Sequence, residues 1–203
     1  MQLHASLTTL LYPLEFHQTQ AEKAEMIFED QQISITSFPM KHRIPTTGFI
    51  FREKPYELKI RKEVITLLNV PLQLIPRIKA GEDYVAADGT VHSNQSITME
   101  SPSPRCYAFC SDTAYFEDII PVIQGATVLY HETTFMNDRE ANAADKFHST
   151  TGQAAAIAMK AGVKKLLIGH YSARYDDLQP LLDEARAVFP ETELTIDGRV
   201  FQI

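Results

Sequence analysis

The second half of the chain alternates short apolar runs with helical segments, and this rhythm constrains the fold more than any other feature. The runs CYAFC, ATVLY and KKLLIG have the length and composition of buried strands. Between the last two, Thr150 and Gln153 form a T-x-x-Q capping box, and Gly162 supplies a helix stop. Strands that alternate with helices predict an α/β layered fold. The predicted helix would pack on the sheet through a stripe of small residues: Ala154, Ile157, Ala158 and Ala161.

The first half contains two further predicted strands and a less regular excursion. Residues 31–38 alternate like a strand, and FIFRE at 49–53 predicts a second strand after a turn-like IPTTG. Residues 54–91 carry three prolines and two turn signals, so we expect them to leave the core, with a helical piece at 58–68. The polar, proline-bearing residues 92–104 are predicted to be loop.

Charge is distributed unevenly along the 203 residues. The net charge is −7, which argues against a protein that coats nucleic acid without specificity. Residues 51–81 nevertheless hold seven Lys or Arg against three Glu, a balance of +4. From charge alone, a solvated helix face explains this segment best.

Compartment and membrane association follow from a few simple features. If Cys106 and Cys110 share a strand, their Cα atoms lie about 13 Å apart, which is too far for a disulfide. Unbridged thiols fit the cytosol, so we expect a cytoplasmic protein. No apolar run is long enough to span a membrane, and residues 1–16 lack the basic start of a signal peptide. No membrane partner is therefore expected.

Polar residues gather where the predicted strands end. Asp112 follows CYAFC, His131 and Glu132 follow ATVLY, His170 follows KKLLIG, and His42 follows the strand at 31–38. Ligands in α/β folds collect outside the carboxyl ends of strands. Imidazole and carboxylate groups together suit Zn²⁺ better than Mn²⁺ or Mg²⁺. The pattern predicts a metal site at this edge.

Each of these residues also has an ordinary interpretation. A lone histidine is more often a hydrogen-bonded core or surface residue than a metal ligand. Asp112 can cap the following helix, and Glu132 can be a surface carboxylate. His4, His17 and His92 do not follow a predicted strand, and we expect them to be structural or surface residues.

His148 lies two residues before the predicted N-cap, where free N–H groups attract phosphate. A histidine there is well placed for acid–base work at a phosphate ester. Arg174, four residues beyond His170, has the geometry for a bidentate phosphate contact. The alternative for Arg174 is an ion pair with a nearby carboxylate such as Asp176 or Asp177.

Five segments together resemble a known family: MKHRIPTTGF, CSDT, HETTF, KFHSTTGQAA and GHYSARY. They occur in the order, and at about the spacing, of the C-terminal half of ribonuclease Z, the tRNA 3′-processing endonuclease of the metallo-β-lactamase superfamily. The resemblance implies an αββα sandwich, of which residues 1–203 form the C-terminal portion. It also implies two zinc ions per complete site, a pre-tRNA substrate and a homodimer.

The resemblance assigns roles to single residues. His42 corresponds to a ligand of one zinc, Asp112 to the carboxylate that bridges two zincs, and His170 to a ligand of the other zinc. His148 corresponds to the group that protonates the leaving 3′-oxygen, coupled to Glu132. The implied phosphate or RNA contacts are Ser172, Arg174, Arg61, Lys62, Arg77 and Lys79.

Two departures from the family pattern matter. Residues 52–91 fall where the family carries a basic, tRNA-binding arm, but the Gly-Pro of that arm is absent from NVPLQLIPRIKAG. The principal metal motif H-x-H-x-D-H occurs nowhere in the sequence. We therefore expect a missing N-terminal half as partner, and we expect this chain alone to be inactive. The alternatives are a phosphodiesterase for small phosphodiesters and a non-catalytic association fragment with an apolar open face.

Overall fold

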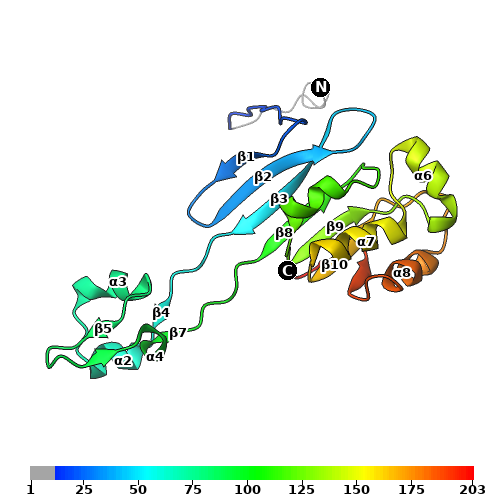
Figure 1. The fold of residues 1–203 in the computed structure, drawn as a ribbon. Coiled ribbons are helices and arrows are strands. Elements are labelled where there is room, and N and C mark those ends of the chain that lie inside the picture. Colours follow the sequence, from blue (N-terminus) through cyan, green and yellow to red (C-terminus); the bar gives the residue numbers. More distant parts are fainter. Residues whose placement is uncertain (1–11) are drawn as a thin grey trace.

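A computed structural model describes residues 12–203, which form a layered body and a protruding arm (Figure 1). His4, and most of the segment expected not to be a signal peptide, lie outside the described residues. The body is built on a seven-stranded sheet, so the α/β prediction is confirmed. In spatial order its strands are β1 (Glu25–Glu29), β2 (Ile33–Met40), β3 (Thr46–Glu53), β8 (Cys106–Cys110), β9 (Val128–Glu132), β10 (Lys165–Gly169) and β11 (Thr192–Leu194). The pairs from β1 to β8 are antiparallel and those from β8 to β11 are parallel.

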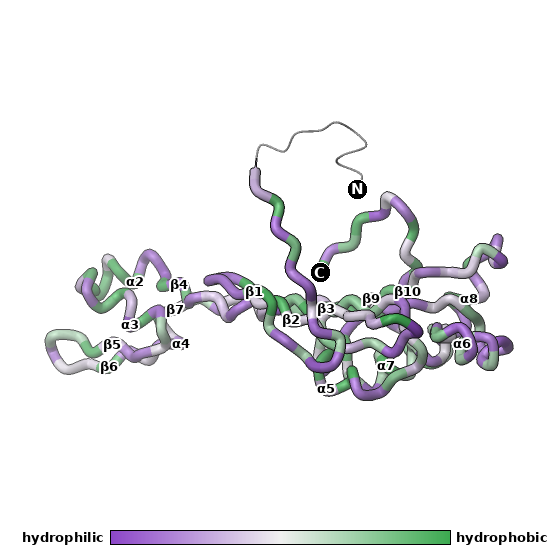
Figure 2. Tube along the Cα trace, turned by 90° about the horizontal axis from the view of Figure 1, so that it is seen from above, coloured by the Kyte–Doolittle hydropathy of each residue, from purple (hydrophilic) through white to green (hydrophobic). Residues whose placement is uncertain are grey.

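The helices of the body are short, and α5, α6 and α7 lie on the same side of the sheet (Figure 2). The helical elements of the body are η2 (Glu117–Ile119), α5 (Ile120–Ile123), η3 (Asn137–Arg139), α6 (Glu140–Lys146), α7 (Thr151–Ala161) and α8 (Gln179–Arg186). The capping box predicted for α7 is present, and Gly162 ends the helix with a φ of 60°. Ala154 and Ala158 have no exposed surface, and Ile157, Ala158 and Ala161 belong to the main core together with Leu166 of β10. Among the described residues, no helix has the length and apolar content needed to cross a lipid bilayer.

The opposite face of the sheet is rich in aromatic side chains. Because Cys106, Ala108 and Cys110 of β8 are buried in the helix-covered core, the alternating Tyr107 and Phe109 face the other way. Phe109 stacks on Tyr130 with ring centroids 4.8 Å apart, and Tyr107 contacts Phe51 at 5.9 Å. These aromatic side chains keep part of their surface exposed, since no helix of residues 12–203 covers this face (Figure 2).

The arm is a small folded unit inserted between β3 and β8 (Figure 1). Its own core contains Ile60, Val70, Ile78, Tyr84 and Ile97. Its elements are β4 (Lys59–Ile60), α2 (Lys62–Leu67), η1 (Leu72–Leu74), α3 (Ile75–Lys79), β5 (Tyr84–Val85), β6 (Val91–His92), α4 (Asn94–Ile97) and β7 (Thr98–Met99). The prediction of loop for residues 92–104 is therefore wrong for the segment that forms α4 and β7. These elements form because β7 pairs with β4 and Ile97 closes the arm core.

The arm is longer and less basic than the sequence suggested. Strand β3 continues through Glu53, which pairs with Arg105 just before β8 begins at Cys106, so the excursion runs over 54–104 instead of 52–91. Its base is closed where the backbone N–H of Glu53 donates to the carbonyl of Arg105 at 2.9 Å. Residues 54–104 hold six Lys or Arg and six Asp or Glu, so their formal charge is zero. The acidic residues that offset the basic segment are Glu82, Asp83, Asp88 and Glu100, all beyond residue 81.

Candidate active site

Four titratable side chains converge at one edge of the sheet. Asp112, Glu132, His148 and His170 each offer a ligand atom, and these atoms all lie within 4.8 Å of one another. Asp112, Glu132 and His170 follow or end the neighbouring parallel strands β8, β9 and β10. His148 comes from the turn between α6 and α7. The carboxyl ends of parallel strands therefore bring together residues that are far apart in the chain.

The backbone at this edge adopts a conformation that side chains seldom tolerate. Asp112, Phe147 and His170 have φ values of 54°, 59° and 59°. They are three of the four non-glycine residues with positive φ in the described part of the chain. Left-handed geometry at non-glycine positions costs free energy and concentrates at functional sites. The packing around the site therefore holds two of its polar residues, and the neighbour of a third, in strained geometry.

Glu132 is the buried centre of the group, with no exposed surface. Its Oε1 accepts from the backbone N–H of Thr113 at 2.8 Å and lies 2.7 Å from Nδ1 of His148. Its Oε2 accepts from the N–H groups of Thr134 and Ser149, both at 3.2 Å, and from the Thr134 hydroxyl at 2.7 Å. Both oxygens are thus occupied by protein donors. The sequence interpretation of Glu132 as a surface carboxylate is wrong, and its carboxylate is not a free metal ligand.

The two partners of the Glu132–His148 contact shift each other's protonation. Burial by itself would raise the pKa of Glu132, but the hydrogen bonds from His148 and Thr134 outweigh burial and lower that pKa. The hydrogen bond to Glu132 raises the pKa of His148 above its ordinary value. The pair therefore favours carboxylate and imidazolium. Because Nδ1 of His148 faces Glu132, Nε2 is the nitrogen left to exchange a proton with a substrate.

Asp112 and His170 form the more exposed part of the group. Nε2 of His170 lies 3.2 Å from Oδ1 of Asp112, and their side chains are 40% and 47% exposed. Nδ1 of His170 lies 2.9 Å from the Thr134 hydroxyl, so Nε2 is the nitrogen directed at Asp112. A carboxylate oxygen and an imidazole nitrogen on an accessible edge are donors that suit zinc.

His42 stands next to the group but outside it. Its ring centroid is 5.4 Å from that of His148, which in turn lies 5.3 Å from that of His170. Nδ1 of His42 contacts the carbonyl of Phe147 at 3.1 Å, which leaves Nε2 available. The structure therefore offers three donor groups of the kind that zinc takes, from His42, Asp112 and His170, with His148 between the two histidines.

His131 does not join the site. It precedes Glu132 on β9, and its side chain lies on the same face of the strand as Leu129 of the main core, so that only 1% of its surface is exposed. Its Nδ1 contacts the carbonyl of Glu132 at 2.7 Å, and its Nε2 has no partner among residues 12–203. Burial lowers its pKa, so it is a neutral core histidine. His17 and His92 lie away from the site, beside Glu15 and Tyr84, as expected of surface or structural residues.

Sequence reasoning missed the residues that hold Glu132: Thr113, Thr134 and Ser149. Each lies within two residues of a predicted site residue, in the segments SDT, HETT and HST. This closeness in the sequence was the signal that could have found them. Their hydrogen bonds to Glu132 arise only when three separate segments meet.

The implied phosphate contacts near the site are preorganised by neighbours. Nε of Arg174 donates to the hydroxyl of Ser172 at 3.0 Å, and its guanidinium lies 5.0 Å from the ring centroid of Phe135. Within the described residues Arg174 forms no ion pair with Asp176 or Asp177. The contacts of Arg174 are therefore those of a cation stacked on an aromatic ring beside the site.

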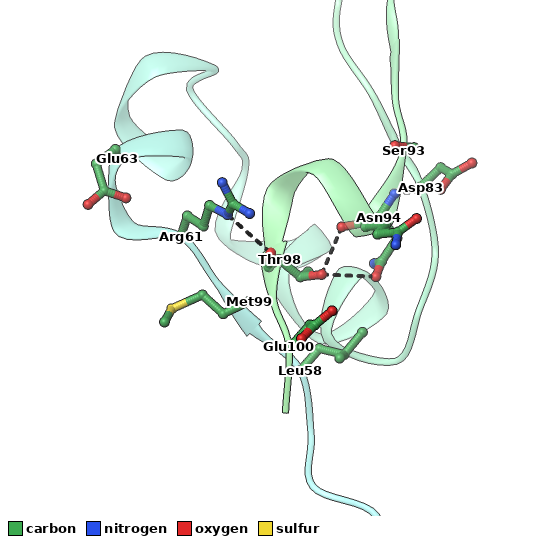
Figure 3. Close-up of a pocket in the computed structure, with 10 residues that line it drawn as sticks. Leu58, Arg61, Glu63, Asp83, Ser93, Asn94, Thr98, Met99 and Glu100 are labelled. Atoms are coloured by element: carbon green, nitrogen blue, oxygen red, sulfur yellow. Dashed lines mark hydrogen bonds between the residues drawn. The ribbon is translucent and has the colours of Figure 1, made fainter. Parts of the chain in front are cut away.

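The implied RNA contacts in the arm differ in availability. Arg77 pairs with Glu82 at 2.6 Å, and Lys79 pairs with Glu57 at 3.4 Å. Arg61 is exposed, and its Nε donates to the carbonyl of Thr98 at 3.1 Å (Figure 3). Lys62 is exposed, and no ion pair with it occurs in the part of the chain that the structure describes.

The hollow shown in Figure 3 belongs to the arm and not to the four-residue group. Its lining includes Leu58, Arg61, Asn94, Thr98 and Met99. The Thr98 hydroxyl donates to the carbonyl of Asn94 at 2.8 Å, so two polar groups of this hollow already satisfy each other. We therefore place the candidate chemistry at the edge of the sheet.

The chain is similar in sequence to proteins named ribonuclease Z. It is 44% identical to ribonuclease Z of Parabacteroides distasonis over 189 residues, which is 93% of this chain and 62% of that protein. It is 37% identical to ribonuclease Z of Cytophaga hutchinsonii over an alignment of 204 positions, covering the whole chain and 65% of that protein. No family model matches. The chain spans about three fifths of the length of these curated relatives.

Solved structures show the same fold. The short form of human tRNase Z (ELAC1) superposes with a TM-score of 0.53 at 21% identity, over 90% of this chain and 48% of that one. The metallo-β-lactamase fold protein YhfI from Bacillus subtilis gives a TM-score of 0.55 at 19% identity, over 91% and 54%. The predicted metallo-β-lactamase-like fold is thus confirmed, as is the resemblance to ribonuclease Z.

Proposed function

We propose that this chain, which is homologous to ribonuclease Z along most of its length, supplies the proton donor and part of the metal-binding set of an endoribonuclease that matures the 3′ end of pre-tRNA. The observation that carries the proposal is the buried Glu132–His148 pair, 2.7 Å apart, beside Asp112 and His170. Identity of 37–45% to proteins named ribonuclease Z supports the substrate class.

Hydrolysis of a phosphodiester adds water to phosphorus and releases the 3′-oxygen, which needs a proton. His148 holds that proton, because its contact with Glu132 raises its pKa. Nε2 of His148 would deliver the proton to the leaving oxygen, while Glu132 stays ionised and keeps the ring oriented. Breakage of the P–O3′ bond then leaves a 3′-hydroxyl on one product and a phosphate on the other.

Asp112, His170 and His42 would hold zinc, two ions per complete site. Zinc, when bound, lowers the pKa of a water molecule and stabilises charge on the phosphoryl oxygens. Ser172 and Arg174 would contact the phosphate from the adjacent loop, with Arg174 held over Phe135.

RNA contact outside the site would fall to the arm, which we assign to 54–104. Because its total charge is zero, RNA binding would depend on local groups and not on a uniform basic surface. Lys62 is the best placed of the four implied residues, since Arg77 and Lys79 are paired with carboxylates and Nε of Arg61 is bonded to the carbonyl of Thr98.

Residues outside this sequence would complete the site. The sequence contains no H-x-H-x-D-H, and the aromatic face of the sheet offers an apolar surface for a further layer. We propose that a segment with that motif covers this face, that this chain alone is inactive, and that the complete enzyme is a cytoplasmic homodimer.

A second candidate function keeps the same chemistry with a smaller substrate. The neutral arm favours it, because such an arm gives little general attraction for a polyanion. The complete enzyme would then cleave small phosphodiesters and would not depend on the arm.

Mixing experiments test the proposal. The chain is combined with a separately produced segment carrying H-x-H-x-D-H, and zinc content and pre-tRNA cleavage are measured. We expect cleavage only in the mixture, and none when the chain carries His148→Ala. Absence of cleavage, with both parts folded, associated and zinc-loaded, would overturn the pre-tRNA assignment. Cleavage of bis(p-nitrophenyl) phosphate by that mixture would then support the second candidate.

A further inference from the structure

One hydroxyl group connects the two halves of the site. Oγ1 of Thr134 lies 2.7 Å from Oε2 of Glu132 and 2.9 Å from Nδ1 of His170. It thereby joins the carboxylate that holds His148 to the ring that faces Asp112. Thr134 is only 8% exposed, and its own backbone N–H also donates to Glu132. The hydroxyl therefore has little freedom to turn away.

The hydrogen-bonding capacity of the groups decides which atom donates. A threonine hydroxyl has one proton to give and two lone pairs to receive. An ionised carboxylate only accepts, so the Thr134 proton goes to Glu132, the shorter and charged contact. The carbonyl of His170, at 3.1 Å, is a longer and neutral competitor for the same proton. The Thr134 oxygen then receives a hydrogen bond from His170, which requires a proton on Nδ1.

We propose that Thr134 is a positioning residue that holds neutral His170 in its Nδ1–H tautomer and couples that choice to the ionised state of Glu132. The tautomer leaves a lone pair on Nε2, the nitrogen 3.2 Å from Oδ1 of Asp112. Nε2 of His170 and Oδ1 of Asp112 then present lone pairs to each other, and a cation bound to both atoms would offset their repulsion. The residue that steadies the proton donor thus also prepares a metal ligand, as outer-shell partners of metal-bound histidines do.

The inference rests on the proposed metal-binding role of Asp112 and His170, but its first test does not. The ring ¹⁵N chemical shifts of His170 are measured in the metal-free chain at about pH 9, well above the ordinary histidine pKa of about 6.5. We expect the Nδ1–H tautomer in the wild type and in Thr134→Ser, which keeps the hydroxyl. In the near-isosteric Thr134→Val the population should shift toward Nε2–H. A wild-type His170 protonated at Nε2 would overturn the proposal whether or not the variants fold.

A neighbouring threonine provides the matched control. Thr133 is fully buried and its hydroxyl donates to the carbonyl of Gly169 at 3.2 Å, so Thr133→Val removes a similar group without touching His170. The tautomer of His170 in Thr133→Val should be the same as in the wild type. An equal shift in both valine variants would mean a general packing effect and would reject the specific role of Thr134.

Zinc titration supplies a second readout in the same chains. Loss of an outer-shell partner typically weakens metal binding about 10–100-fold. We expect such a loss with Zn²⁺ alone for Thr134→Val, and near wild-type binding for Thr134→Ser. Equal Zn²⁺ affinity in Thr134→Val and the wild type would contradict the coupling to the metal ligand. Failure of pre-tRNA cleavage in the mixing experiment would leave the tautomer result unchanged, so the two proposals fail separately.

Discussion

Nδ1 of His148 lies 2.7 Å from Oε1 of Glu132, and of these two side chains only that of His148 reaches solvent. The Glu132 side chain has no exposed surface, whereas that of His148 is 18% exposed. The carboxylate is thus held by protein donors, and the imidazole keeps one nitrogen toward solvent. A buried charge of this kind is costly unless all its hydrogen bonds are made, which explains why three loops donate to it.

The first prediction concerns the pH at which His148 loses its proton. Glu132→Gln removes the charge that raises the His148 pKa, so this pKa should fall. A proton-detected NMR titration of the histidine rings measures it. The control Glu117→Gln removes a surface carboxylate that pairs with Lys160, and it should leave the titration of His148 unchanged. An unaltered His148 pKa in Glu132→Gln would contradict the assigned cause.

The same pair sets a pH window for stability. The raised His148 pKa means that its contribution is complete below the ordinary value of 6.5 and is lost as pH rises through the folded-state pKa. The lowered Glu132 pKa means that its contribution is complete above 4.5 and is lost as pH falls through the folded-state value. The stabilisation from the pair should therefore be greatest between these limits.

The second prediction concerns the cost of removing the buried carboxylate. Glu132→Ala leaves His148 and the N–H groups of Thr113 and Ser149 without their acceptor. Breaking a buried pair in this way costs about 3–5 kcal/mol of unfolding free energy. Urea denaturation followed by circular dichroism measures it, since the chain has no tryptophan. Glu117→Ala, which removes an exposed pair, should cost under about 1 kcal/mol. Similar losses in both variants would argue against a special role for burial.

The third prediction is that the arm can be removed without unfolding the body. Glu53 and Arg105 are joined by a backbone hydrogen bond and an ion pair, so β3 and β8 already meet at the base of the arm. An Asn-Gly turn in place of 54–104 should close them as a hairpin. Hydrogen exchange should show unchanged protection of β9, β10 and α7, while fluorescence anisotropy should show weaker binding of pre-tRNA. Loss of protection throughout the sheet would mean that the arm is required for the fold.

The fourth prediction separates the basic residues of the arm by their present partners. Lys62→Ala should weaken pre-tRNA binding and reduce the slope of log affinity against log salt by about 1, as expected for one lost phosphate contact. Arg77→Ala should have a smaller effect, because Arg77 already pairs with Glu82 at 2.6 Å. Glu82→Ala should strengthen binding by releasing Arg77. Equal effects of Lys62→Ala and Arg77→Ala would show that the ion pair does not govern availability.

Local sequence was sufficient where a local interaction defines the element. The capping box of Thr150 and Gln153 and the stop at Gly162 predicted α7, because these contacts form within the helix itself. Short apolar runs predicted β8, β9 and β10, because strands with apolar side chains on both faces have such sequences. The order of five motifs then indicated His42, Asp112, Glu132, His148 and His170, all of which the structure places at one edge of the sheet.

Other features carried no sufficient local signal. The strand β3 begins at Thr46, inside a segment expected to be a turn, because it pairs with Met40 of β2. Two-residue strands such as β4 and β7 have no readable period, and they exist only because each pairs with the other. The charge of the arm was overestimated because the count stopped at residue 81, whereas Glu82, Asp83, Asp88 and Glu100 belong to the same folded unit.

The sequence by itself determined which residue types stand at the strand ends and where the helix α7 and the strands β8, β9 and β10 form, since these depend on neighbours along the chain. Only the tertiary structure decided that Glu132 is saturated by donors from three loops, that His131 faces the core, and that Thr134 joins Glu132 to His170. These relationships depend on side-chain direction and on packing between distant segments. Their free energy comes from burial and hydrogen bonds that do not exist until the sheet has assembled.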